Sequence, residues 1–160
     1  MLHPAVAHFA VALPIISLVL GLAYLYKPSE LMSKVSSRFM VFAAIFMIAA
    51  FFSGKSDGGE VYILLSAEGK QLLLQHKDLG LYLAIAMGIA AVIKFYGCFK
   101  QNFKAELFAI ILVAIIAGGT LYQGKMGGDL TYTHGAHVKD HSDGMDCLAE
   151  EAEDEEDDEE

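Results

Sequence analysis

The hydrophobic positions of this chain fall into four long blocks that short polar connections separate. The blocks predict helices at about residues 4–26, 35–53, 67–99 and 105–127. Each block is close to the roughly 20 residues that an α-helix needs to cross a bilayer. The pattern therefore predicts an all-α fold, a four-helix transmembrane bundle.

The connections differ in length and character. Residues 27–34 (KPSELMSK) and 100–104 (KQNFK) are short and polar, whereas residues 54–75 (GKSDGGEVYILLSAEGKQLLLQ) are longer. The second half of this longer connection has helical character, which predicts that the third helix begins outside the membrane. Pro14 lies inside the first block, and a proline kink is tolerated in a membrane helix.

Composition supports a membrane protein and isolates one acidic segment. Hydrophobic residues make up 55% of the 160 residues, and the mean hydropathy is +0.45. Of the 20 acidic residues, 13 lie in residues 140–160, so residues 1–139 combine 7 acids with all 11 Lys and Arg and carry a net charge of +4. We therefore expect one transmembrane domain over residues 1–138 and a disordered acidic tail over residues 139–160.

Basic residues predict the orientation of the bundle. Those near the first and third connections are Lys27, Lys34, Arg38, Lys94, Lys100 and Lys104. The opposite side holds five Lys residues spread over much more sequence and mixed with acids. By the positive-inside rule, both termini are predicted to be non-cytoplasmic. The first block has no positive leading region and no small-residue cleavage site, so it is predicted to be a retained helix.

All six histidines fall on the predicted non-cytoplasmic side. They are His3, His8, His76, His134, His137 and His141. His3 and His8 are separated by about 7.5 Å of helical rise and about 140° of rotation, which suits two partners better than one. Neutral imidazole ligates haem iron, copper and zinc, and a helical bundle can hold a flat cofactor between facing histidines.

A second group of metal-capable side chains follows the last block. It comprises His134, His137 and His141 with Asp140, Asp143 and Cys147. Such groups can hold zinc or copper, although their spacing matches no tight signature. No C-x-x-C-H motif for covalent haem attachment occurs.

Other interpretations of the same residues stay open. Interfacial histidines can be solvated without any ligand, and the glycines of the last block can serve helix packing alone. No nucleophile elbow, phosphate loop or H-E-x-x-H motif is present, so hydrolytic catalysis is not favoured. The apolar blocks carry no ionisable residue at the expected mid-depth, which argues against an ion channel or transporter.

Four segments, in this order along the chain, carry motif-like patterns: HPAVAHFAVAL, SGKSDG, QHKDLG and GGDLTYTHGAHV. Together they resemble the bacterial membrane proteins grouped as the domain of unknown function 2231 family. HPAVAHFAVAL resembles that family's opening H-P-x-x-x-H-F-P-I-A-L, and SGKSDG resembles its T-G-x-x-A segment. QHKDLG resembles its H-x-x-x-G start of helix 3, and GGDLTYTHGAHV its closing G-G-x-L-V-Y-x-H-G-x-G-V. The resemblance covers residues 1–138. The chain departs from it at Ala10, where the family usually has Pro, and at His137, where it usually has Gly.

The resemblance implies a four-helix membrane protein with a redox role, because members often occur beside or fused to Rieske-type or cytochrome c domains. The histidines that match the family pattern are His3, His8, His76 and His134. We infer that these four could ligate one or two b-type haems. The expected pairs are His8 with His76 and His3 with His134.

Three functional hypotheses follow. The first is a small b-type cytochrome-like protein of the bacterial inner membrane that binds haem at its periplasmic side and exchanges electrons with quinol or a periplasmic redox protein. The second is a copper- or zinc-binding membrane protein that uses the same histidines together with the tail, where His134, His137 and His141 are the candidate ligands. The third is a cofactor-free accessory subunit of a respiratory complex. An electron carrier or subunit is expected rather than a stand-alone enzyme, with lipid and a second copy of the chain as further partners and no nucleic acid.

Overall fold

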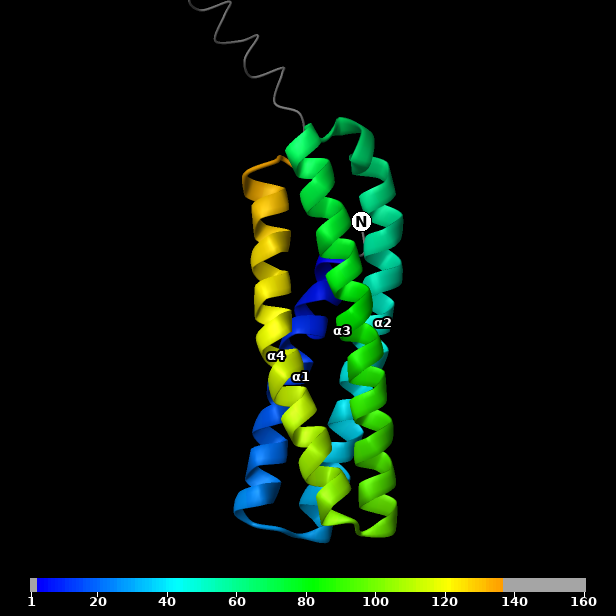
Figure 1. Ribbon diagram of the computed structural model, residues 1–160, viewed down its shortest axis with the longest axis vertical. Helices are drawn as coiled ribbons and strands as arrows, with labels where there is room; N and C mark the ends of the chain where they lie inside the picture. Colours follow the sequence, from blue (N-terminus) through cyan, green and yellow to red (C-terminus); the bar gives the residue numbers. More distant parts are fainter. Residues whose placement is uncertain (1–2, 137–160) are drawn as a thin grey trace, which may run out of the picture.

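The computed structural model describes residues 3–136, and nearly all of this part is α-helical. The elements in chain order are α1 (His3–Tyr26), α2 (Glu30–Val61), the short 3-10 helix η1 (Tyr62–Leu64), α3 (Ala67–Lys100) and α4 (Phe103–Tyr132). Figure 1 shows them as one elongated bundle. The predicted all-α, four-helix architecture is confirmed.

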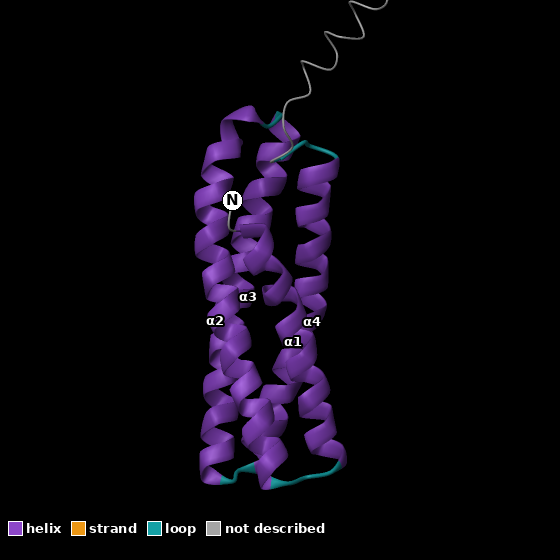
Figure 2. Ribbon diagram, turned by 180° about the vertical axis from the view of Figure 1, so that it is seen from behind, coloured by secondary structure: helices purple, strands orange, loops and turns teal. Residues whose placement is uncertain are grey.

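The four helices form an antiparallel ring in which each packs against the helices before and after it. α1 packs against α2 and α4, and α3 packs against the same two helices from the other side (Figures 1 and 2). α1 begins and α4 ends at the same end of the bundle, which we call the histidine end. The two short connections, at residues 27–29 and 101–102, lie at the opposite end, which we call the short-loop end.

Local polar groups fix where three of the helices begin. The side chains of Ser29, Ser66 and Asn102 each accept a hydrogen bond, at 3.2 Å, from the backbone N–H three residues later. Such N-caps satisfy one of the N–H groups that a helix start leaves without an intrahelical partner. α3 ends at Gln101, whose φ of 51° places it in the left-handed region that terminates helices.

Two helices are longer than the apolar blocks predict. The second was predicted over residues 35–53 but spans Glu30–Val61, and the fourth was predicted over residues 105–127 but spans Phe103–Tyr132. The Ser29 cap starts α2 early, and α2 continues through Gly58 and Gly59 despite the low helix propensity of glycine. Packing explains the continuation, because the end of α2 joins a separate apolar cluster at the histidine end. That cluster contains Val61, Leu65, Leu130 and Ala136.

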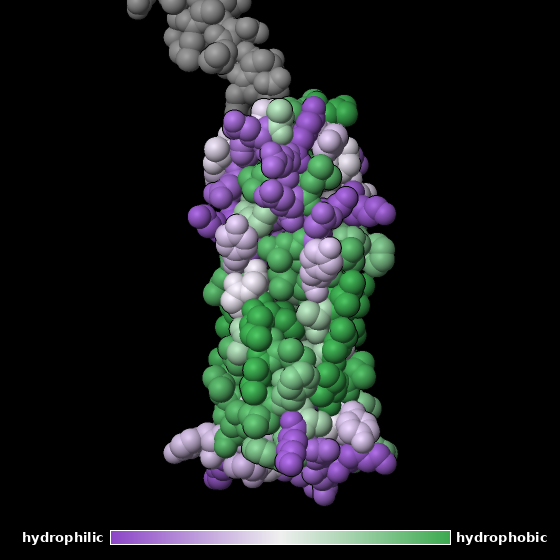
Figure 3. All heavy atoms as spheres, in the orientation of Figure 1, coloured by the Kyte–Doolittle hydropathy of each residue, from purple (hydrophilic) through white to green (hydrophobic). Residues whose placement is uncertain are grey.

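The interior of the bundle is built from small and flexible apolar side chains, and the large ones face outward. Ala43, Ala90 and Val113 are fully buried, as are Met40 and Met87. Exposed large apolar residues occur on all four helices. Small interior residues allow close helix approach where lipid, rather than water, surrounds the bundle. On the face shown in Figure 3, apolar residues form a belt between two polar bands.

This distribution identifies a membrane protein. All four helices are long and apolar enough to cross a membrane, with α2 counted together with η1 as Glu30–Leu64. The orientation of the bundle stays a prediction. The acidic tail predicted over residues 139–160 lies outside the described residues.

Gly21 provides a direct test of the close packing between α1 and α4. A Cβ atom on Gly21 would lie 2.9 Å from Cγ1 of Ile110, which is too close for a real contact. We expect Gly21→Leu to lower the free energy of unfolding by about 1–3 kcal/mol, because it overpacks a tight interface. Thermal unfolding in mild detergent, followed by circular dichroism, measures the change.

Gly118→Leu is the matched control, since nothing lies within 4 Å of a Cβ atom at that position. This variant should unfold at or above the wild-type temperature. Equal destabilisation by both substitutions would show that the α1–α4 contact is not the cause.

Candidate functional site

His3 stands at the start of α1 and contacts α2. Its Nδ1 lies 3.2 Å from Oγ of Ser53, and its backbone N–H donates to Oδ2 of Asp57 at 3.3 Å. Its ring also lies directly on Gly54, where a Cβ atom would come within 2.7 Å of Cε1. The carboxylate of Asp57 thus stabilises the N-terminus of α1, and the missing side chain of Gly54 leaves room for the imidazole.

His76 lies in α3 and is partly buried against α4. Its carbonyl oxygen accepts a hydrogen bond of 2.7 Å from Nε2 of Gln123, which ties α3 to α4. Cε1 of its ring lies 3.4 Å from the position that a Cβ atom of Gly127 would take. Its Nδ1 is buried and has no hydrogen-bond partner, and the same holds for Oε1 of Gln123. A buried nitrogen without a partner is costly and calls for an explanation.

His3 of α1 and His76 of α3 both lie toward the histidine end of the bundle. Their rings are close enough to interact electrostatically. His3 contacts α2 at Gly54 and His76 contacts α4 at Gly127, so two ligand-capable imidazoles approach each other from separate helices.

His8 does not join this pair. It is exposed, and its Nδ1 lies 2.5 Å from the carbonyl oxygen of Pro4 on its own helix. Because His3 and His8 differ by about 140° around the helix axis, only one of them can face the interior. His76 interacts electrostatically with His3, and the expected pairing of His8 with His76 stays a prediction.

His134 follows the end of α4 and contacts the start of α3. Its backbone N–H bonds the carbonyl of Asp129 at 3.3 Å, and its Cβ and Cγ lie 3.2 Å from the Cβ position of Gly69. Gly69 is seven residues before His76, about 10 Å along the helix. His134 thus lies about two turns beyond the level of His76 on α3, and its expected pairing with His3 stays a prediction. His137 and His141, the other predicted metal ligands, lie outside the described residues.

Three supporting residues were not singled out from the sequence. Ser53 and Asp57 fall in the SGKSDG segment. The resemblance to the family drew attention to this segment, but it did not indicate that Ser53 and Asp57 contact His3. Gln123 stands in an apolar stretch of α4, and only its polarity there could have drawn attention to it. Its role depends on the packing of α4 against α3.

A second polar site, at the short-loop end, joins all four helices. Glu106 of α4 accepts hydrogen bonds from Tyr24 of α1 at 3.0 Å and Ser33 of α2 at 2.7 Å. It also forms an ion pair with Lys94 of α3, whose Nζ lies 4.2 Å from the centre of the Tyr24 ring. Gly97 makes room for the carboxylate side chain, since a Cβ atom there would lie 2.7 Å from Cγ of Glu106.

This network corrects one inference from the sequence. Lys94 was counted among the basic residues that flank the membrane, yet it is fully buried, and Glu106 is 2% exposed. The bundle interior therefore holds an ionisable pair near its short-loop end. Lys94 and Glu106 lie on either side of the turn at residues 101–102, within two helical turns of it, which is the one signal in the sequence that could have paired them.

Removing one partner of this pair should destabilise the bundle strongly. We expect Glu106→Leu to cost about 3–5 kcal/mol, because it leaves the Lys94 charge buried without compensation. The double variant Lys94→Met/Glu106→Leu should recover most of this loss. Unfolding in mixed detergent micelles, followed by circular dichroism, gives the three free energies.

The exposed ion pair of Lys34 and Glu30 is the control. Its removal should change stability little, because solvent screens such pairs. A double variant of Lys94 and Glu106 that is no more stable than Glu106→Leu would contradict the uncompensated-charge explanation.

Comparison with known proteins places the sequence in a family. The sequence model of the family described as "Predicted membrane protein (DUF2231)" matches residues 1–140. No curated protein and no solved structure matches the chain.

Proposed function

We propose that this chain, which belongs to the DUF2231 family of predicted membrane proteins, is a small membrane electron carrier that binds a b-type haem through His3 and His76. The observation that carries the proposal is that these two imidazoles, from α1 and α3, are close enough to interact electrostatically, with a glycine of a neighbouring helix beside each ring.

The donor set suits a haem. Two neutral imidazoles are the axial ligands that a b-type haem needs, and one of them, His76, has a buried Nδ1 without a hydrogen-bond partner. Glycines stand where each ring meets a neighbouring helix, Gly54 beside His3 and Gly127 beside His76. A bound haem would supply one-electron redox chemistry at this place.

The chain's own residues would orient the ligands. The contact between Ser53 and Nδ1 of His3 fixes the plane of that ring, as second partners of ligand histidines commonly do. Gln123 holds the backbone of α3 at His76, and Asp57 holds the first turn of α1. These contacts set the separation of α1 and α3 on which ligation by both rings depends.

Copper or zinc is less well supported by the described residues. Protein sites for these metals use three or four ligands, and residues 3–136 contain no group of three or more His, Cys, Asp or Glu side chains suited to a metal ion. Copper or zinc binding is therefore the alternative outcome of the absorption experiment.

We further propose a bacterial inner-membrane location with the histidine end facing the periplasm. Without the buried Lys94, the short-loop end still carries Lys27, Lys34, Arg38, Lys100 and Lys104 close to the membrane ends of the helices. The haem ligands would then lie on the periplasmic side, where a quinol or a periplasmic redox protein could exchange electrons with them.

An absorption spectrum of the purified protein tests the proposal. The dithionite-reduced minus oxidised difference should show Soret and α bands at a near-stoichiometric haem content. His76→Ala and His3→Ala should each abolish the bands, because each removes an axial ligand. Ser53→Ala should weaken haem retention about tenfold, since it frees the His3 ring to rotate.

His8→Ala is the matched control, because that histidine is exposed and should leave the spectrum unchanged. Haem bands that persist in the His76→Ala variant would refute ligation by this pair. Absence of haem together with stoichiometric copper or zinc, lost in His134→Ala, would favour the metal-binding alternative.

A further inference from the structure

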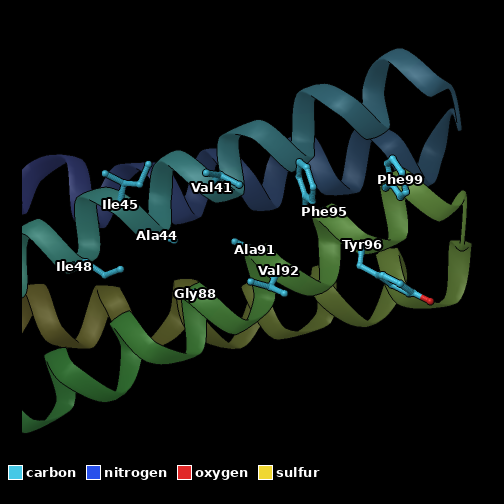
Figure 4. A pocket seen from close by; sticks show the side chains of 10 residues that line it. All are labelled: Val41, Ala44, Ile45, Ile48, Gly88, Ala91, Val92, Phe95, Tyr96 and Phe99. Carbon is cyan, nitrogen blue, oxygen red and sulfur yellow. The ribbon is translucent and has the colours of Figure 1, made fainter.

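An apolar groove runs along the outer surface of the bundle between α2 and α3. Its volume is about 450 Å³, and small residues form its floor: Ala44 on α2 with Gly88 and Ala91 on α3 (Figure 4). Nothing lies within 4 Å of a Cβ atom at Gly88, so this glycine leaves open space rather than a close helix contact. The volume falls within the range of ligand-binding clefts.

The groove has a direction. Ile48 and Gly88 line the part near the middle of the helices, and three aromatic residues of α3, Phe95, Tyr96 and Phe99, line the part toward the short-loop end. Figure 4 shows the Tyr96 hydroxyl pointing toward that end. An apolar channel that becomes amphipathic near the membrane boundary matches the division of a lipid into chain and headgroup.

Two exposed cations stand at the short-loop end of the groove, one on each helix. Arg38 is seven residues from Ile45, two helical turns, and therefore lies on the same face of α2 as that lining residue. Lys100 of α3 places Nζ 5.5 Å from the centre of the Phe99 ring, which itself lines the groove. Lys34, also at this end, forms an ion pair with Glu30. The negative charge of Glu30 is therefore neutralised by Lys34 and not by Arg38 or Lys100.

From this arrangement we propose that the α2–α3 groove binds an anionic phospholipid. One acyl chain lies on the floor of Ala44, Gly88 and Ala91, and the phosphate contacts Arg38 and Lys100. Basic residues between transmembrane helices at the membrane surface are a recognised way of holding anionic headgroups. The site faces the short-loop end and does not depend on the haem proposed at the histidine end.

The same features favour a lipid over a second copy of the chain. Packing of two transmembrane helices relies on small residues that repeat along both partners, so that backbones approach closely. Here the small floor is bordered by Val92, Phe95 and Tyr96, which are all exposed and large, so these side chains stand between the floor and the backbone of a second helix. A second copy of the chain would bring its own Arg38 and Lys100 to the groove, and these like charges would give no electrostatic attraction.

Native mass spectrometry of the full chain tests the site. The delipidated protein is offered phosphatidylglycerol and phosphatidylcholine with identical acyl chains in equal amounts. We expect one phosphatidylglycerol bound per chain with a preference of about tenfold over phosphatidylcholine, because two cations meet the anionic headgroup. Arg38→Gln/Lys100→Gln should remove the preference, and Gly88→Leu should remove retention of both lipids by filling the groove.

Two control variants separate the site from general membrane affinity. Gly118→Leu fills an equally open position on α4, and Lys125→Gln removes an exposed cation at the histidine end; neither should change lipid retention. Equal retention of the two lipids by the wild type, or unchanged retention in Gly88→Leu, would overturn the proposal. A dimer that Gly88→Leu converts to a monomer would also overturn it, by showing that a second copy occupies the groove.

Discussion

The carboxylate of Glu106 receives a hydrogen bond or an ion pair from every other helix of the bundle. Tyr24, Ser33 and Lys94 reach it from α1, α2 and α3. An ionised group inside a membrane protein is costly unless it is paired and hydrogen-bonded, and here both conditions are met. Because three donors must meet the same two oxygens, the network admits one register of the four helices at the short-loop end.

A fixed register at one end positions the side chains at the other. Small residues such as Ala43 and Ala90 let the helices approach closely. A rotation or shift of one helix would therefore change its packing contacts along its whole length. His3 and His76 lie on α1 and α3, which do not follow each other in the ring, and both contact the helices between them. Their meeting therefore depends on the packing of all four helices.

The bundle separates three kinds of surface along its length. Polar residues concentrate at its ends, the buried network lies inside, and the groove with its open Gly88 lies on the outer face. Glycine serves opposite purposes in these places. Gly54 and Gly97 admit the side chains of His3 and Glu106, whereas Gly88 leaves a space that the chain itself does not fill.

The sequence by itself determined the number of helices, their membrane character and the histidines that gather at one end. These properties follow from the length of the apolar blocks and from the antiparallel order that short connections impose. Only the tertiary structure decided that His3 rather than His8 packs against α2, that Lys94 is buried with Glu106, and that α2 extends to Val61. Each of these depends on the rotation of a helix about its axis or on contacts between helices. Apolar blocks that must face lipid are hydrophobic on every side, so their sequences show little helical periodicity of hydrophobic residues. Such sequences therefore specify neither the rotation of a helix nor its contacts with the other helices.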